Sequence, residues 1–136
     1  MRLAEAFRIQ KEFDKALQFA QESLDLMERV GDLYSQARVL LRLCLIHLDA
    51  GVYDKAVEAG KRCLKVYEKS QDKLSVAFAL GNLGLAYIGL GEDAKAERCL
   101  QESRQIGQAL DNQRWLDYLD MREGEIRVAL AEKREM

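Results

Sequence analysis

The feature that most constrains the fold of this chain is an internal repeat with a period of 40 residues. When the sequence is shifted by 40 positions, residues 11–50 match residues 51–90 at eleven positions. The block that begins at Gly91 continues the pattern more loosely. A period of this length is typical of a solenoid, in which each unit buries its apolar face only against its neighbours. Matching pairs include Asp14/Asp54, Lys15/Lys55, Ala16/Ala56, Asp32/Asp72 and Leu43/Leu83.

The spacing within a unit predicts two helices. Apolar residues recur at steps of three and four, as they do on one face of a helix; Leu17, Ala20 and Leu24 are an example. Asp32 and Asp72 recur at one phase as candidate N-caps, while Gly51 and Gly91 mark a tighter turn. These signals predict helices over residues 1–10, 12–30, 33–50, 53–70, 73–90, 93–110 and 113–133.

The composition excludes several classes of protein. Of the 136 residues, 49 % are apolar and 32 % are charged, which argues against a disordered chain. Proline is absent and aromatic residues make up only 7 %, whereas an all-β domain needs more β-branched and aromatic residues. An all-α protein is therefore expected, as a single domain over residues 1–136.

Charge, hydropathy and cysteine content limit the partners and the cellular compartment that are expected. The formal net charge of −2 provides no basic field for nucleic acid. The apolar stretch from Val39 to Leu48 is interrupted by Arg42 and is shorter than the ~20 residues of a membrane span, so no membrane partner is expected. Three cysteines without a CxxC pair favour a reduced, cytoplasmic protein.

One stretch carries a family resemblance. Residues 77–103 resemble a tetratricopeptide repeat, with the small and large positions of its motif in order. The first unit shows the same order, with Leu3, Ala4 and Phe7 in its first helix. The matching residues of the third unit are Leu80, Leu83, Gly84 and Tyr87 in the first helix and Ala96, Leu100 and Ser103 in the second.

The resemblance implies a right-handed α-solenoid of antiparallel helix hairpins. It contains about three repeats, at residues 1–32, 33–72 and 73–112, and a polar-edged capping helix at 113–136. The period is 40 rather than the usual 34, and the proline that often closes the motif is missing. Both departures resemble the long-repeat subclass found in rapsyn, kinesin light chain and the spindle-orientation scaffolds that bind GoLoco peptides.

Cys44 and His47 are one helical turn apart, so a thiolate–imidazole pair or half of a metal site is conceivable. Both residues, however, fall at core positions of the repeat, and Cys63 falls at a small core position of the next helix. Free cysteines commonly act as small buried hydrophobes. Structural packing is therefore expected, with no enzymatic activity, no metal and no cofactor.

By the resemblance, the first helix of each hairpin lines a concave groove. The helix over 33–50 is apolar on nearly all of its faces. It carries more apolar residues than packing against two neighbouring helices would bury. The surplus apolar residues are then expected to face a bound peptide or helix, although ordinary burial in a tighter superhelix would also explain them. The apolar groove residues are Leu41, Leu45, Phe78, Leu85 and Tyr118.

One position, read down all the units, holds Arg2, Arg42, Asn82 and Arg122 at spacings of 40. By the resemblance, this position points into the groove, where the Asn82 amide would bind a peptide backbone and Arg38 would lie nearby. A solvated face of arginines paired with local carboxylates is the alternative. The expected function is a non-enzymatic scaffold or adaptor whose protein partner presents acidic and apolar residues. A self-associating segment, a fragment of a larger scaffold and a sensor of a signalling peptide remain as alternatives.

Overall fold

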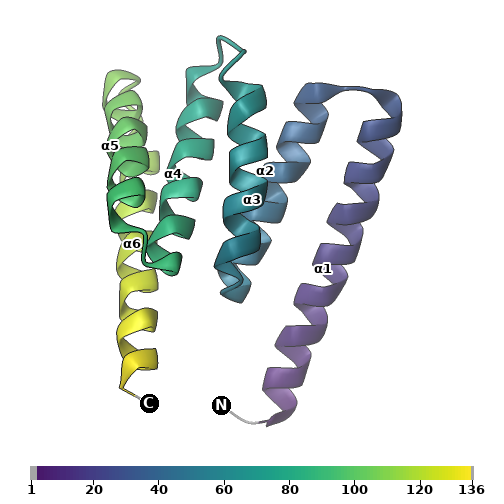
Figure 1. The fold of residues 1–136 in the computed structure, drawn as a ribbon, viewed down its shortest axis with the longest axis vertical. Coiled ribbons are helices and arrows are strands. Elements are labelled where there is room, and N and C mark those ends of the chain that lie inside the picture. The colour runs from purple at the N-terminus through teal and green to yellow at the C-terminus, as the bar shows by residue number, and fades with distance from the viewer. Residues whose placement is uncertain (1–2, 136) are drawn as a thin grey trace.

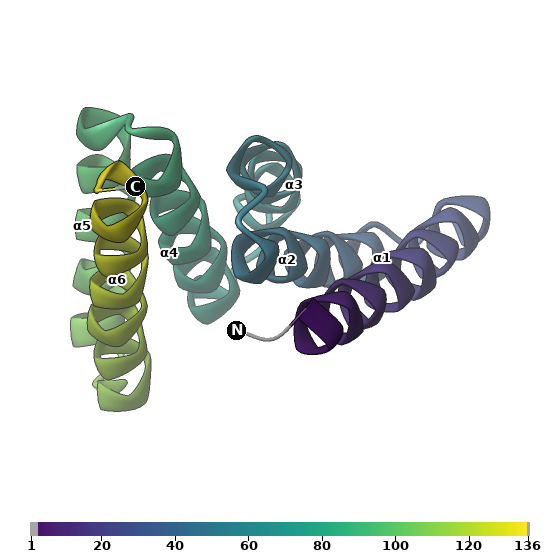
Figure 2. The same cartoon turned by 90° about the horizontal axis from the view of Figure 1, so that it is seen from below.

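Within residues 3–135 the chain folds into six α-helices that pack one upon the next. The computed structural model describes residues 3–135, except for the side chain of Phe7. The helices form a row of two layers, with α2, α4 and α6 on one side and α1, α3 and α5 on the other (Figures 1 and 2). Their bounds are Leu3–Val30 (α1), Leu33–Ala50 (α2), Tyr53–Tyr67 (α3), Lys73–Leu90 (α4), Asp93–Ala109 (α5) and Gln113–Arg134 (α6). This arrangement confirms the predicted all-α solenoid.

The turns lie where the repeat predicts them. Gly51 and Gly91 adopt φ of 75° and 77°, a left-handed conformation that glycine takes without a Cβ clash. At the other ends of the hairpins, the carboxylates of Asp32 and Asp72 accept hydrogen bonds from the backbone N–H groups of Ser35 and Ser75. Each of these bonds satisfies one of the free N–H groups in the first turn of a helix.

The first helix departs from the prediction. Helices over 1–10 and 12–30 were expected, but α1 is continuous through this region. Lys11 stands at the position that Gly51 and Gly91 hold in the later units, and its neighbours Gln10 and Glu12 are also good helix formers. No residue there favours the left-handed conformation of a turn. The N-terminal part of α1 therefore runs on beyond the end of α2 (Figure 1).

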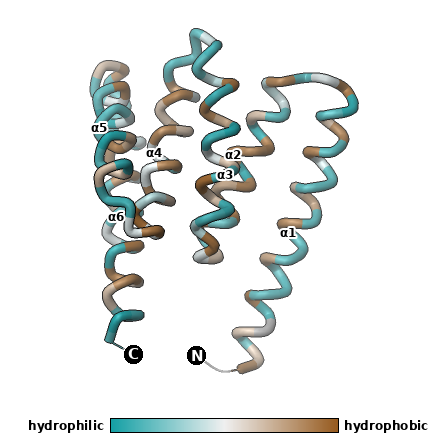
Figure 3. Tube along the Cα trace, in the orientation of Figure 1, coloured by the Kyte–Doolittle hydropathy of each residue, from teal (hydrophilic) through white to brown (hydrophobic). Residues whose placement is uncertain are grey.

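The core is centred on α4, which packs against α2, α3, α5 and α6. Its tube is mostly brown and white, whereas α1 and α5 are largely teal (Figure 3). By length and composition, α4 could cross a membrane, and 61 % of it is buried inside the fold. The longest apolar segment is therefore α4, rather than the stretch from Val39 to Leu48.

Glycine brings α6 close to α4. A Cβ atom on Gly81 would lie 2.8 Å from Cδ2 of Leu119 and closer still to the Trp115 ring. Ser103 of α5 completes this contact, since its hydroxyl donates to the Ala77 carbonyl (2.7 Å) and accepts from the Trp115 indole N–H (2.9 Å). The polar atoms at the junction of α4, α5 and α6 are thereby satisfied.

Candidate functional site

The nine residues predicted to line a groove all lie on α2, α4 and α6, the three helices of one layer. Those on α2 are the most accessible. The side chains of Arg38 and Arg42 are exposed, and those of Leu41 and Leu45 are partly buried. This half of the predicted surface can be reached from solvent.

The residues on α4 and α6 are covered to different degrees, since Phe78 and Tyr118 are partly buried while Leu85 and Asn82 are buried. The Phe78 ring packs edge-on against Trp115, with 4.7 Å between centroids, and Tyr118 stacks on the same indole at 5.3 Å. Leu85 is fully buried and Asn82 is 3 % exposed. The expectation that Leu85 and Asn82 line an open groove is therefore wrong, because both side chains are buried.

The Asn82 amide is used inside its own helix. Its Nδ2 atom donates to the Phe78 carbonyl oxygen at 2.9 Å. Its Oδ1 atom is buried and has no hydrogen-bond partner among the described residues. Because the side chain is buried, a peptide backbone has no access to this amide in the fold described.

The guanidinium of Arg122 is also taken up by contacts within the fold. Its guanidinium donates to Asp49 at the end of α2 (2.6 Å) and to Glu125 one turn ahead (2.9 Å), and its side chain is 15 % exposed. The predicted row of polar residues therefore divides into an accessible Arg42, a buried Asn82 and a paired Arg122. Arg2, the first member of the row, lies outside the described residues.

The accessible arginines border a pocket of about 380 Å³ between α1 and α2. We refer to this pocket as the α1–α2 groove. Phe19 lies on its α1 side and is 70 % exposed, which is unusual for a phenylalanine. The groove is lined by Phe19, Ala20, Ser23, Met27, Ser35, Arg38, Val39 and Arg42.

The repeat explains what this groove is. Most of the positions 40 residues further on are buried, and α2 packs there against α3 and α4. The α1–α2 groove is thus the place where a helix preceding α2 would pack in a regular array. The buried equivalents of its lining residues include Ala59, Cys63, Tyr67, Ala79 and Asn82.

Phe19 was missed from the sequence, although a signal was present. The equivalent residues are Ala59, which is buried, and Cys99, which is partly buried. A phenylalanine in a position that otherwise holds small packed residues indicates that the usual neighbouring helix is absent. Comparing side-chain size at equivalent positions would have identified it.

The cysteines and His47 have the environment of core residues. Burial raises the pKa of both Cys44 and Cys63 to about 12, so the thiols stay protonated near neutral pH and are poor nucleophiles. Burial also lowers the pKa of His47. No group of three or more potential metal ligands occurs in residues 3–135.

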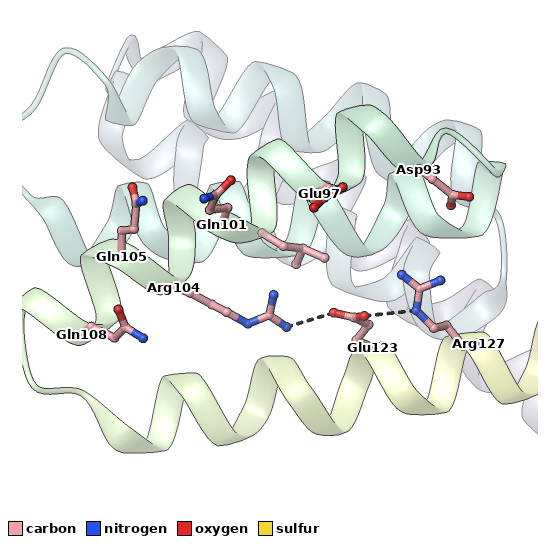
Figure 4. Close-up of a pocket in the computed structure, with 9 residues that line it drawn as sticks. Asp93, Glu97, Gln101, Arg104, Gln105, Gln108, Glu123 and Arg127 are labelled. Carbon is pink, nitrogen blue, oxygen red and sulfur yellow. Dashed lines mark hydrogen bonds and ion pairs between the residues drawn. The ribbon is translucent and has the colours of Figure 1, made fainter.

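A larger pocket of about 680 Å³ lies at the other end of the array, between α5 and α6 (Figure 4). Three of the charged groups that line it, Arg104, Glu123 and Arg127, are joined by ion pairs. Glu123 accepts from Arg104 (2.9 Å) and from Arg127 (3.0 Å), and Arg104 also reaches Asp120 (3.1 Å). Burial raises the pKa of Glu123, but hydrogen bonds from Arg104 and Arg127 outweigh it and hold the pKa below its usual value.

These charges replace apolar residues of the earlier units. Arg104 is equivalent to Leu24 and Leu64, and Glu123 is equivalent to Leu43 and Leu83. In the first unit those leucines form part of the surface that receives α3. The α5–α6 pocket is therefore a solvated, charged edge, whereas the pocket at the α1–α2 end is lined in part by the apolar residues Phe19, Met27 and Val39.

Comparison with known proteins agrees with the repeat pattern. A family model described as a tetratricopeptide repeat matches residues 1–69 and, in a second match, residues 35–109. No curated protein matches the chain.

Proposed function

Since the chain belongs to the tetratricopeptide repeat family, whose repeats generally mediate protein–protein interaction, we propose that it is a non-enzymatic interaction module. It holds a helical segment of a partner protein in the α1–α2 groove. The observation that carries this proposal is the exposed Phe19 beside two exposed arginines, at a place where the next unit is covered by a helix.

The apolar part of the groove supplies the affinity. Phe19, Val39 and Met27 line it together with the small residue Ala20. Burying one phenylalanine or methionine side chain contributes about 1.5–3 kcal/mol. An amphipathic helix laid antiparallel to α1 would cover all of them with one face.

The two arginines supply the specificity. Arg38 and Arg42 are one turn apart on α2, and neither makes an ion pair within residues 3–135. A guanidinium binds a carboxylate through directional hydrogen bonds, which can be bidentate. The preferred partner helix is therefore apolar on one face and acidic along the edge that lies over α2.

The setting that we propose is cytoplasmic and requires no cofactor. The three cysteines are free thiols, and two of them are fully buried. Such thiols suit a reducing compartment. The helix-docking mechanism uses packing and charge alone.

A displayed library of amphipathic helical peptides, with one apolar face and randomised flanking positions, tests the proposal. Selection on the wild-type protein should enrich acidic residues at one flank. Arg42→Glu should weaken the selected peptides at least tenfold, because it removes a charge-assisted bond of about 1.5–3 kcal/mol and adds repulsion. Phe19→Ala should weaken binding without changing its salt dependence.

The matched control is Arg98→Glu, the same substitution at an exposed site on α5. Equal loss of binding in Arg98→Glu and Arg42→Glu would contradict the proposal, and so would selected peptides without acidic residues. Circular dichroism confirms that each variant remains folded.

A further inference from the structure

We infer that the helix in the α1–α2 groove is residues 3–10 of a second copy of this chain. Two copies would exchange the N-terminal parts of α1, each filling the groove of the other. This inference rests on the proposed function, because it names the occupant of the same groove.

The first argument is that residues 3–10 are equivalent, by the 40-residue period, to part of the helix that fills this place in the next unit. Leu3 is equivalent to Leu43 of α2, and Ala4 is equivalent to Cys44, each at a spacing of 40. Leu43 and Cys44 are both buried. Leu3 and Ala4 therefore stand at core positions of a helix that packs in a groove of this kind.

In their own chain these residues are not packed in that way. Leu3 is 72 % exposed, and Ala4 is exposed. The segment extends past the end of α2, and a turn back onto α1 would have to form at Lys11, where the later hairpins have a left-handed glycine. A helical segment of this length gains little stability in water without tertiary contacts.

An exchange with a second copy makes the missing contact while α1 stays continuous. In the later hairpins, a Cβ on Gly84 would lie 2.8 Å from Leu100, and one on Gly60 would lie 3.5 Å from Cys44. The equivalent pair in the first unit is Ala4 and Ala20. Two α1 helices crossing antiparallel near Lys11 bring Ala4 of each copy onto Ala20 of the other, and both residues are small enough for close approach.

Charge complementarity supports the same arrangement. Neighbouring helices in the α4–α6 layer meet through Phe78 and Trp115, which are 37 residues apart. The same spacing places Glu5 of one copy opposite Arg42 of the other. Both side chains are exposed, and neither makes an ion pair within the described part of the chain. The exchanged helix thus provides the acidic edge that the groove requires.

Disulfide trapping tests the arrangement directly. Ala4→Cys and Ala20→Cys are combined in the full-length chain that also carries Cys99→Ser, since Cys99 is the one native cysteine that is only partly buried. Within one continuous helix, residues 4 and 20 are about 24 Å apart, too far for a disulfide. Mild oxidation should therefore give a covalent dimer on a non-reducing gel, whereas either cysteine alone should give little.

A monomer with no free engineered thiol would show that α1 folds back on its own chain, and this result would overturn the exchange. A monomer with both thiols free would overturn it as well. The displayed peptides distinguish the two proposals. If they bind the groove while the double-cysteine protein stays monomeric, then the exchange fails and the proposed function stands.

Sedimentation of the full-length chain over a wide range of concentrations provides a second measurement. Glu5→Arg and Arg42→Glu should each weaken the dimer at least tenfold, and their combination should restore it. Lys11→Gly supplies the missing turn residue and should shift the protein to monomer, whereas Lys11→Ala should not. If the double charge reversal fails to restore the dimer, Glu5 does not face Arg42 and the arrangement is wrong.

Discussion

The guanidinium of Arg122 donates a hydrogen bond to the carboxylate of Asp49, with 2.6 Å between Nη2 and Oδ1, across 73 residues of sequence. Asp49 lies near the end of α2 and Arg122 lies in the middle of α6, on either side of α4 (Figure 2). This ion pair joins two helices that are not neighbours in the row. It closes one end of the layer in which a groove was expected.

The Arg122–Asp49 pair should show measurable coupling. Because the Arg122 side chain is mostly buried and that of Asp49 is half exposed, a double-mutant cycle with alanine should give about 1 kcal/mol. Chemical denaturation of the wild type, the two single variants and the double variant provides the measurement. The exposed pair Glu92–Lys95 is the control and should give about 0.3 kcal/mol. Equal coupling in both pairs would contradict a role in closing the layer.

Gly81→Ala should destabilise the fold by about 1–3 kcal/mol, because the added methyl group overlaps the Trp115 ring and Leu119. Gly124→Ala is the matched control, since nothing lies within 4 Å of a Cβ at that helical position. It should stabilise the protein by about 0.5–1 kcal/mol. Urea denaturation monitored by circular dichroism measures both changes. A neutral Gly81→Ala would show that α6 does not depend on close contact with α4.

Ser103→Ala should cost about 1–3 kcal/mol, because it leaves the buried Trp115 N–H and the Ala77 carbonyl without their shared partner. Ser23→Ala tests the equivalent position of the first unit, where the hydroxyl bonds only to the Phe19 carbonyl of its own helix. That change should be close to neutral. Denaturation curves recorded by Trp115 fluorescence report the loss at α6 directly, and similar curves for the two variants would be inconsistent with this account.

Glu123 predicts how stability depends on pH. Its pKa is below the usual value of 4.5, so a proton binds the unfolded chain more tightly than the folded one. The stabilisation is therefore fully present above about pH 4.5 and is lost as the pH falls through the folded-state pKa. Glu123→Gln should flatten the acid part of a plot of melting temperature against pH. Glu132→Gln, at an exposed site on the same helix, should leave the curve unchanged.

The turn and cap residues that recur every 40 positions predicted most of the helices, because such residues act on the backbone next to them. Glycine at positions 51 and 91 and aspartate at positions 32 and 72 determine where a helix can end or begin, whatever surrounds it. The same period contained the signal for the continuous α1, since Lys11 replaces a turn glycine. The break near residue 11 was predicted from the apolar pattern of the repeat, although no turn residue stands at that position.

The candidate site was less predictable, because its accessibility depends on contacts between distant residues. Asn82 and Arg42 occupy equivalent positions, yet Asn82 is buried and Arg42 is exposed. α4 packs between two helices of its own layer, α2 and α6, whereas α2 contacts only α4 in that layer among the described residues. Equivalent sequence positions therefore predict the direction of a side chain but not whether another helix covers it.

The charged edge on α5 and α6 gives the molecule a polarity that limits how copies can assemble. A fibre grows when the front of one copy packs on the back of the next without closing. Here the back presents Arg104, Glu123 and Arg127, and covering them would strip water from charges that already satisfy one another. If copies exchange helices at the α1–α2 groove as proposed above, both grooves of a two-fold pair are filled and no apolar groove is left for a third copy, so assembly would stop at two.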